Sequence, residues 1–233
     1  MLEALKKRLL THPDGALADC KLAVKQASTL SLADAMLRIE GELAGRLTPL
    51  ARQARRCADE LPLPKGIFVE AEDRQRAYTY FLDALPMLHR LTLSVKQSVM
   101  GYQQLRTIAN TRERNAHHAK RHLCLLEVAM TETGVTKFSV APLHEQLKQQ
   151  NEHAAEFDFI LTSHTDRLLR YCNETLNAFF IGCEKVADLQ RHGRAADPSR
   201  AVLLLDGLAR ETDLFTDELM LAASAISERR TPI

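Results

Sequence analysis

The fold is decided by the stretch from Pro142 to His192, PLHEQLKQQNEHAAEFDFILTSHTDRLLRYCNETLNAFFIGCEKVADLQRH. It contains no second proline and a single glycine, Gly182. Apolar side chains recur every three or four residues, which is the spacing of one face of an α-helix. A helix of this length would measure about 75 Å and can bury such a stripe only against other helices. The stripe consists of Leu143, Leu147, Ala154, Phe157, Leu161, Leu168, Cys172, Leu176, Phe179, Cys183 and Val186.

A second long helix is predicted just before this one. The chain reads as helical from about Val69, with a kink at Pro86, and residues 88–133 read as one helix ending before Gly134. The connector that follows is short, so the two helices should be antiparallel neighbours. We therefore expect an all-α fold: an elongated bundle built on two long antiparallel helices, about 88–133 and 142–192, with additional helices packed along them.

Shorter helices are predicted on both sides of this pair. Proline and glycine between Leu61 and Gly66 form the clearest break, which divides an N-terminal helical subdomain (1–60) from the long-helix bundle (69–233) through a connector at 61–68. We expect the two parts to form one continuous assembly, because 60 residues make a marginal core. The predicted short helices cover about 2–10, 14–28, 32–46 (with Ser31 as N-cap) and 198–228 (with a cap at Asp197). Thr48 and Pro49 either start a new helix, with Thr48 as N-cap and Pro49 first, or kink the previous one, which continues to about Glu60.

Composition excludes several classes of protein. The 233 residues include 31 Lys and Arg against 30 Asp and Glu, so no partner follows from net charge. The five cysteines are odd in number and widely spaced, which argues against a disulfide framework or a zinc ribbon. The sequence also lacks an apolar run long enough for a transmembrane helix and a signal-peptide pattern at the start. We expect a soluble, cytoplasmic protein.

One zone is chemically unusual. Residues 106–122 read RTIANTRERNAHHAKRH, where five basic residues and three histidines accompany a single acid, Glu113. Between Asn110 and His122 the apolar stripe thins to Ala116 and Ala119. The helix predicted to face this zone is also polar. The candidate binding residues are Arg106, Arg112, Arg114, His117, His118, Lys120, Arg121 and His122 on the first helix, and Glu152, Glu156, His164 and Asp166 on the second.

A turn centred near Lys137 predicts which of these residues meet. It would place His118 opposite Glu156, His122 opposite Glu152 and Arg112 opposite Thr162. Three interpretations of the zone stay open. It is a solvated face with cross-helix ion pairs, a metal or small-ligand site, or a basic patch for phosphate, nucleotide or an acidic partner helix. The metal candidates are His118, His122, Glu152 and Glu156, although the Glu-x-x-His and His-Glu-x-x-His signatures are missing from the sequence.

Catalytic patterns are also missing: the sequence has no Gly-rich phosphate loop, Gly-x-Ser-x-Gly or Cys-x-x-Cys. We therefore expect no catalytic residue and no cofactor, and interpret the protein as a non-enzymatic interaction, regulatory or adaptor module. Its partner would be another protein or a second copy, as in a homodimer, bound through helical faces. Nucleic acid is disfavoured because no aromatic residue interleaves the arginines. The alternative function is a ligand- or metal-binding bundle that uses the zones 106–122 and 152–166.

Overall fold

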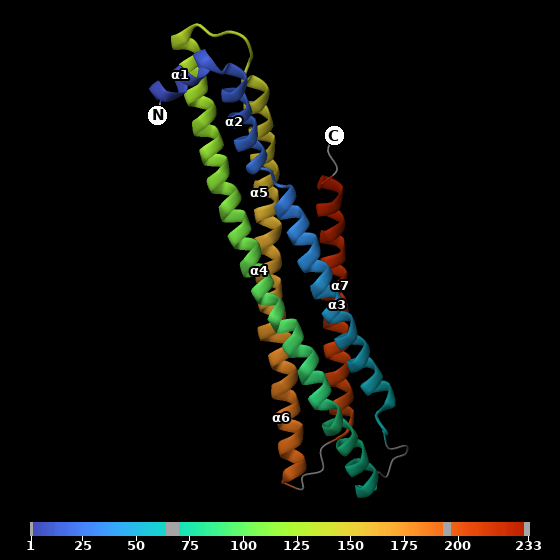
Figure 1. Cartoon of the computed structure of the whole chain (residues 1–233). Helices are drawn as coiled ribbons and strands as arrows, with labels where there is room; N and C mark the ends of the chain where they lie inside the picture. The colour runs from blue at the N-terminus through green and yellow to red at the C-terminus, as the bar shows by residue number, and fades with distance from the viewer. Residues whose placement is uncertain (1, 64–69, 193–196, 231–233) are drawn as a thin grey trace. The chain divides into compact units, whose positions relative to one another are not determined.

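The computed structural model describes residues 2–63, 70–192 and 197–230, with the side chains of 229 and 230 outside the description. Within these ranges the chain is all-α and contains no strand, so the predicted fold class is confirmed (Figure 1). None of the described helices combines the length and apolar character that a membrane crossing requires. The helices are α1 (Leu2–Thr11), α2 (Pro13–Gln26), α3 (Leu30–Glu60), α4 (Ala71–Thr133), α5 (Ala141–Arg170), η1 (Tyr171–Leu176), α6 (Asn177–Arg191) and α7 (Ser199–Arg230).

The chain forms two compact units. Unit 1 contains residues 1–36 and 103–161, and unit 2 contains residues 37–102 and 162–233. Each unit combines segments from both sides of the predicted connector at 61–68, so the units do not follow that boundary. Most of the connector, residues 64–69, lies outside the described residues.

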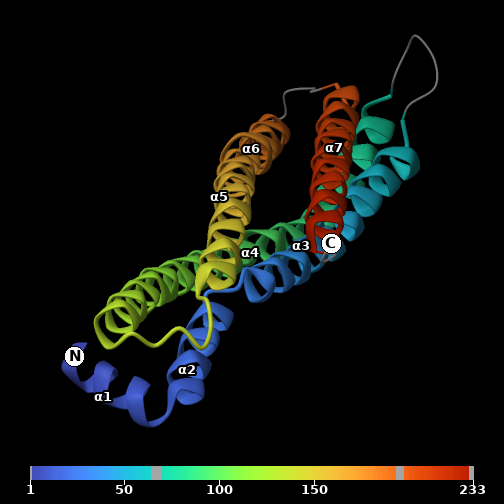
Figure 2. The same cartoon turned by 90° about the horizontal axis from the view of Figure 1, so that it is seen from above.

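Unit 1 is built around the C-terminal half of α4, with α1, α2 and α5 beside it (Figure 1). Leu9 of α1, Val24 of α2 and Leu126 of α4 share one buried cluster. The short leucine-rich helix at the N-terminus therefore packs into the protein core. Val140 is buried in the same cluster and Phe138 packs against it, so the connector between α4 and α5 is anchored to the core. Figure 2 shows this connector passing on the side of α2, where Lys137 Nζ lies 2.8 Å from Asp14 Oδ2.

The apolar stripe of the decisive stretch is buried in both units. Five stripe residues were predicted to be largely buried, and their exposed fractions are all 4% or less, which confirms the prediction: Phe157, Leu161, Leu168, Leu176 and Phe179. The first two belong to unit 1 and the other three to unit 2. In unit 2 the stripe lies against α7, where the ring of Tyr171 stacks on Phe215 with centroids 4.9 Å apart.

Two prolines lie inside helices that continue through them. Of the two alternatives at Thr48–Pro49, a new helix is wrong and continuation of the previous one is observed, because α3 extends from Leu30 to Glu60. A proline removes one helical N–H and crowds the carbonyl group four residues earlier. Pro49 is exposed and the residue four positions earlier is the exposed Gly45, so water can reach that carbonyl. Pro86 is likewise exposed within α4, which begins at Ala71, two residues after the predicted start.

The predicted long helix over 142–192 is interrupted by one π-helical turn, η1, rather than by a break. The stripe takes two four-residue steps in succession there, from Leu168 to Cys172 and then to Leu176. In a regular helix these steps drift around the axis, and the wider π-turn compensates for the drift. All three side chains are buried, so the stripe stays on one face through the turn.

Two predicted helix ends are close to the observed ones. Gly134 follows α4 with φ of +70°, a conformation that glycine adopts without strain. At α7 the Asp197 carboxylate accepts a hydrogen bond from the Ser199 backbone N–H at 3.0 Å. The hydrogen bond from the Ser199 hydroxyl, and after it the one from the backbone N–H, lower the pKa of Asp197. By contrast, α3 begins at Leu30 rather than after Ser31, and the Ser28 hydroxyl accepts from the Leu30 N–H at 3.3 Å.

Candidate functional site

The unusual polar zone of α4 lines a groove in unit 1. The groove has a volume of about 530 Å³, and we call it the basic groove. Alanine side chains from α4 and α5 form its apolar surface, which explains why the helices leave space between them at this height. Its lining residues are Leu32 from α3, Arg106, Ala109, Asn110, Arg112, Glu113, Ala116, His117 and Lys120 from α4, and Asn151, Ala154, Ala155 and Asp158 from α5.

Arg112 is the most constrained cation of the basic groove. Its side chain is 8% exposed. Its Nε–H donates to the carbonyl oxygen of Ala27 at 2.9 Å, and an Nη2–H donates to the Asn151 amide oxygen. Ala27 is the C-cap of α2, where helical carbonyl groups lack partners within their own helix. Asn115 assists by donating from Nδ2 to the Gln26 carbonyl oxygen at 3.1 Å.

These contacts correct one sequence-based prediction. Arg112 was predicted to lie opposite Thr162, but it contacts Asn151, about three turns earlier on α5. The prediction considered α4 and α5 alone. The free carbonyl groups at the end of α2 also need donors, and they draw the guanidinium toward that helix.

Arg112 has no ion-pair partner among the described residues, and Glu113 acts on its charge only from a distance. Both hydrogen-bond acceptors of the Arg112 guanidinium are neutral oxygen atoms. Burial lowers the pKa of Arg112, but a guanidinium stays protonated at neutral pH. A nearly buried positive charge therefore lies in the wall of the groove.

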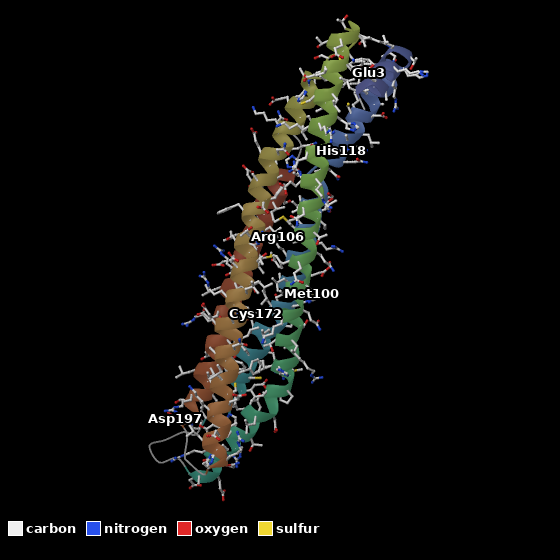
Figure 3. All side chains as sticks on the ribbon, turned by 90° about the vertical axis from the view of Figure 1, so that its left-hand side faces the viewer. Glu3, Met100, Arg106, His118, Cys172 and Asp197 are labelled. Carbon is white, nitrogen blue, oxygen red and sulfur yellow. The ribbon has the colours of Figure 1, made fainter. Side chains whose placement is uncertain are left out.

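Two further cations line the groove, Arg106 and Lys120, and both are exposed. In the part of the chain that the structure describes, neither has a hydrogen-bond or ion-pair partner. Two carboxylates, Glu113 and Asp158, also line the groove, and Glu113 Oε1 lies 3.8 Å from His117 Nε2. Arg106 is therefore available to a ligand at one end of the groove and Lys120 at the other (Figure 3 labels Arg106).

A second hollow of about 820 Å³ adjoins the basic groove along the same two helices. The two share Lys120, Asn151 and Ala155, so together they form a continuous channel on unit 1. From Arg106 to Glu127 this channel follows α4 for about 30 Å. The second hollow is more acidic, since its charged lining comprises Glu127, Glu145 and Glu152 with Lys120 and Lys148.

Several predicted site residues lie elsewhere. The rings of His118 and His122 lie in contact with centroids 4.3 Å apart and planes tilted by 36°, and neither residue lines the basic groove. Desolvation and the neighbouring His118 lower the pKa of His122, while Asp19 of α2 raises it. The predicted pairs of His118 with Glu156 and of His122 with Glu152 stay predictions.

Among the candidate residues that do not line the basic groove, only Glu152 lines the second hollow. Arg114 donates from Nε to the Asn110 carbonyl oxygen of its own helix at 3.4 Å. Arg121, Glu156 and Asp166 are exposed. Among the described residues no three His, Cys, Asp or Glu side chains gather closely enough to hold a metal ion.

His164 belongs to a separate buried cluster in unit 2. Its Nδ1 lies 2.7 Å from Glu40 Oε1, and the two side chains are 7% and 1% exposed. The other carboxylate oxygen, Oε2 of Glu40, and the hydroxyl of Tyr102 are buried without a hydrogen-bond partner among the described residues. Burial and the charge of Glu40 raise the pKa of Tyr102. The cluster is closed to solvent, which favours a structural role.

Sequence analysis missed Glu40, although a signal for it exists. Met36, Glu40, Leu43 and Leu47 follow one another at three- and four-residue spacing, so a charged residue occupies a core position of α3. A buried carboxylate needs a partner, and a histidine on an apolar seam of another helix can supply one. Sequence analysis placed His164 in one polar zone with Arg112, but His164 belongs to unit 2 and Arg112 to unit 1.

Comparison with known proteins gives no match: no family model, curated protein or solved structure is significantly similar to this chain.

Proposed function

We propose that the protein is a non-enzymatic interaction module whose basic groove binds an acidic segment of a partner protein. The observation that carries this proposal is the nearly buried guanidinium of Arg112, whose two acceptors are neutral. A charge without an ion-pair partner in a partly buried site is costly, and an anionic group in the groove would offset part of that cost. Arg106 and Lys120, which are exposed and unpaired among the described residues, would contribute attraction at the entrance.

The dimensions of the channel favour a peptide segment over a single ion. The two adjoining hollows run along α4 for about 30 Å, which matches about twenty residues of helix. Phe159, one residue beyond the groove residue Asp158, is 75% exposed and would offer an apolar contact. A segment whose acidic residues lie in the basic groove, whose part beside the second hollow is neutral or basic, and which carries one apolar residue therefore fits this surface.

The free cysteines bear on where the module works. All five cysteines are unpaired, and four of them are buried. Burial raises the pKa of Cys20 to about 11, so its thiol stays protonated and unreactive at neutral pH. These properties suit a reducing compartment, and we place the proposed function in the cytoplasm.

Fluorescence anisotropy with labelled hexaglutamate tests the proposal. Saturable binding that weakens with added salt is expected, whereas labelled hexalysine should not bind. Arg106→Glu should lower the affinity about tenfold, because it replaces an attraction by a repulsion. Absence of saturable binding at low salt would refute the proposal.

A second candidate, binding of a small anion such as phosphate beside Arg112, rests on the same guanidinium. Ala155 lines both hollows, so Ala155→Phe should fill the channel without changing its charge. If a peptide segment is the ligand, this variant should lose hexaglutamate binding, while Ala178→Phe on α6 should retain it. If a small anion is the ligand, inorganic phosphate should compete with hexaglutamate and should still bind the Ala155→Phe variant, as isothermal titration calorimetry would measure.

A further inference from the structure

Helix α7 in unit 2 carries apolar residues on two faces. One face is buried in the unit and includes Leu205, Leu208 and Phe215. On the other side Leu203, Leu214 and Leu221 are 70%, 54% and 73% exposed. These three leucines are separated by eleven and seven residues, or about three and two turns, so they share one face of the helix. Such a leucine stripe is unusual on a helix whose other face already packs in a core.

Small residues alternate with the leucines on this face. Gly207 lies seven residues before Leu214 and Ala225 lies eleven residues after it, so both belong to the same face. A side chain added at Gly207 would meet nothing within 4 Å, so the helix surface is open there. A shallow hollow of about 310 Å³ surrounds this point and is lined in part by Leu203 and Gly207.

The stripe complements itself when a second α7 lies antiparallel with Leu214 at the centre. Residues equally far before and after Leu214 then come to the same height. Leu221 of one helix falls opposite Gly207 of the other, and Leu203 falls opposite Ala225, so each large side chain meets a small one.

The charges match in part in the same arrangement. Arg210, four residues before Leu214, falls opposite Glu218 of the other helix, four residues after it, whereas Glu211 falls opposite Asp217. Within its own chain Arg210 Nη2 lies 3.3 Å from Glu211, and Glu218 pairs with Arg167 at 2.9 Å. Both of these pairs are exposed, and exposed ion pairs exchange partners at little cost. A parallel arrangement would instead place Arg210 against Arg210 and leucine against leucine.

We propose that the protein forms a homodimer through this face, with two α7 helices antiparallel about a two-fold axis that passes near Leu214. A closed two-fold interface uses the same patch on both copies, which a self-complementary stripe provides. The contact extends from Leu203 to Ala225, about 33 Å of helix. One helix pair buries less than the roughly 1,200 Å² of standard stable interfaces, so the dimer should dissociate on dilution.

Sedimentation equilibrium over about 1 to 500 µM tests the proposal. The wild-type chain should pass from monomer to dimer within this range. Leu214→Glu should weaken dimerisation at least about tenfold, while Met100→Glu, an equally apolar and exposed position on α4, should not change it. A chain that stays monomeric throughout, or a dimer that Leu214→Glu leaves unchanged, would overturn the proposal.

A charge exchange tests the antiparallel arrangement. Arg210→Asp should weaken the dimer, and Glu218→Arg added to the same chain should restore it, because the two positions face each other across the axis. In a background of Cys124→Ser, which removes the exposed thiol, Leu214→Cys should form a disulfide-linked dimer under mild oxidation. Failure of both the charge rescue and the cross-link would exclude this geometry.

Discussion

Replacing either member of the buried Glu40–His164 pair by leucine should destabilise unit 2 by different amounts. His164→Leu leaves a carboxylate that is 1% exposed without its partner at 2.7 Å. Removing one partner of a buried pair costs about 3–5 kcal/mol, because the remaining charge is unpaired. We expect His164→Leu to reduce the free energy of unfolding by an amount in this range.

Glu40→Leu should cost less. It also removes the second carboxylate oxygen, Oε2, which is buried without a hydrogen-bond partner among the described residues. An unsatisfied buried acceptor costs about 1–3 kcal/mol, so its removal offsets part of the loss. We expect a net loss of about 2 kcal/mol. The double variant should be more stable than His164→Leu alone, since two apolar side chains replace the pair.

Urea denaturation followed by far-UV circular dichroism measures these free energies. A double-mutant cycle gives the coupling between the two sites, which should exceed about 1 kcal/mol. Glu60→Ala, which breaks the exposed Arg56–Glu60 pair, is the control and should leave the denaturation midpoint unchanged. The reasoning is refuted if the two single effects simply add, or if Glu40→Leu is the more damaging change.

Three other predictions concern helix ends, pH and close packing. Asp197→Ala should reduce the free energy of unfolding by about 1 kcal/mol in urea denaturation, because α7 loses its cap. Hydrogen bonds lower the pKa of Asp197, so the difference in stability between wild type and variant should disappear as pH falls through that pKa. The pKa of His122 is lowered in the folded chain, so the unfolded chain binds a proton at this residue first, and the free energy of unfolding should decrease below about pH 6.5. His122→Asn should reduce the difference in melting temperature between pH 7.5 and pH 5, and an equal difference in both proteins would contradict this. A methyl group at Gly182 would lie 2.5 Å from Cδ2 of the half-buried Leu204, and this crowding offsets the helical gain of alanine over glycine of about 1 kcal/mol. Gly182→Ala should therefore change the melting temperature little in the wild-type chain and raise it in a Leu204→Ala background, where the space is open.

The long helices could be predicted because they depend on local patterns. The apolar stripe from Leu143 to Val186 and the scarcity of glycine and proline both indicate helix without knowledge of the partner helices. The thinning of the α4 stripe to alanines also indicated a polar opening between helices. It became the basic groove, where Ala116 of α4 meets Ala154 and Ala155 of α5.

The partners of individual polar residues could not be predicted. They depend on third helices that a two-helix comparison leaves out: α2 for Arg112, and α3 for His164. The continuity of α3 through Pro49 depends on solvent reaching one carbonyl group, which the sequence does not report. The π-turn at Tyr171–Leu176 left a trace in the spacing of the stripe, but two successive four-residue steps are too weak a signal to identify it.

The central claim, that the basic groove is where an acidic segment binds, is tested most directly by two neighbouring charges of α4. Lys120 lines the groove and Arg121 does not, although both are exposed and cationic. We predict that Lys120→Glu raises the dissociation constant for labelled hexaglutamate about tenfold, while Arg121→Glu changes it less than about threefold. Equal effects of the two variants would show that binding follows overall charge rather than the groove, and would contradict the account.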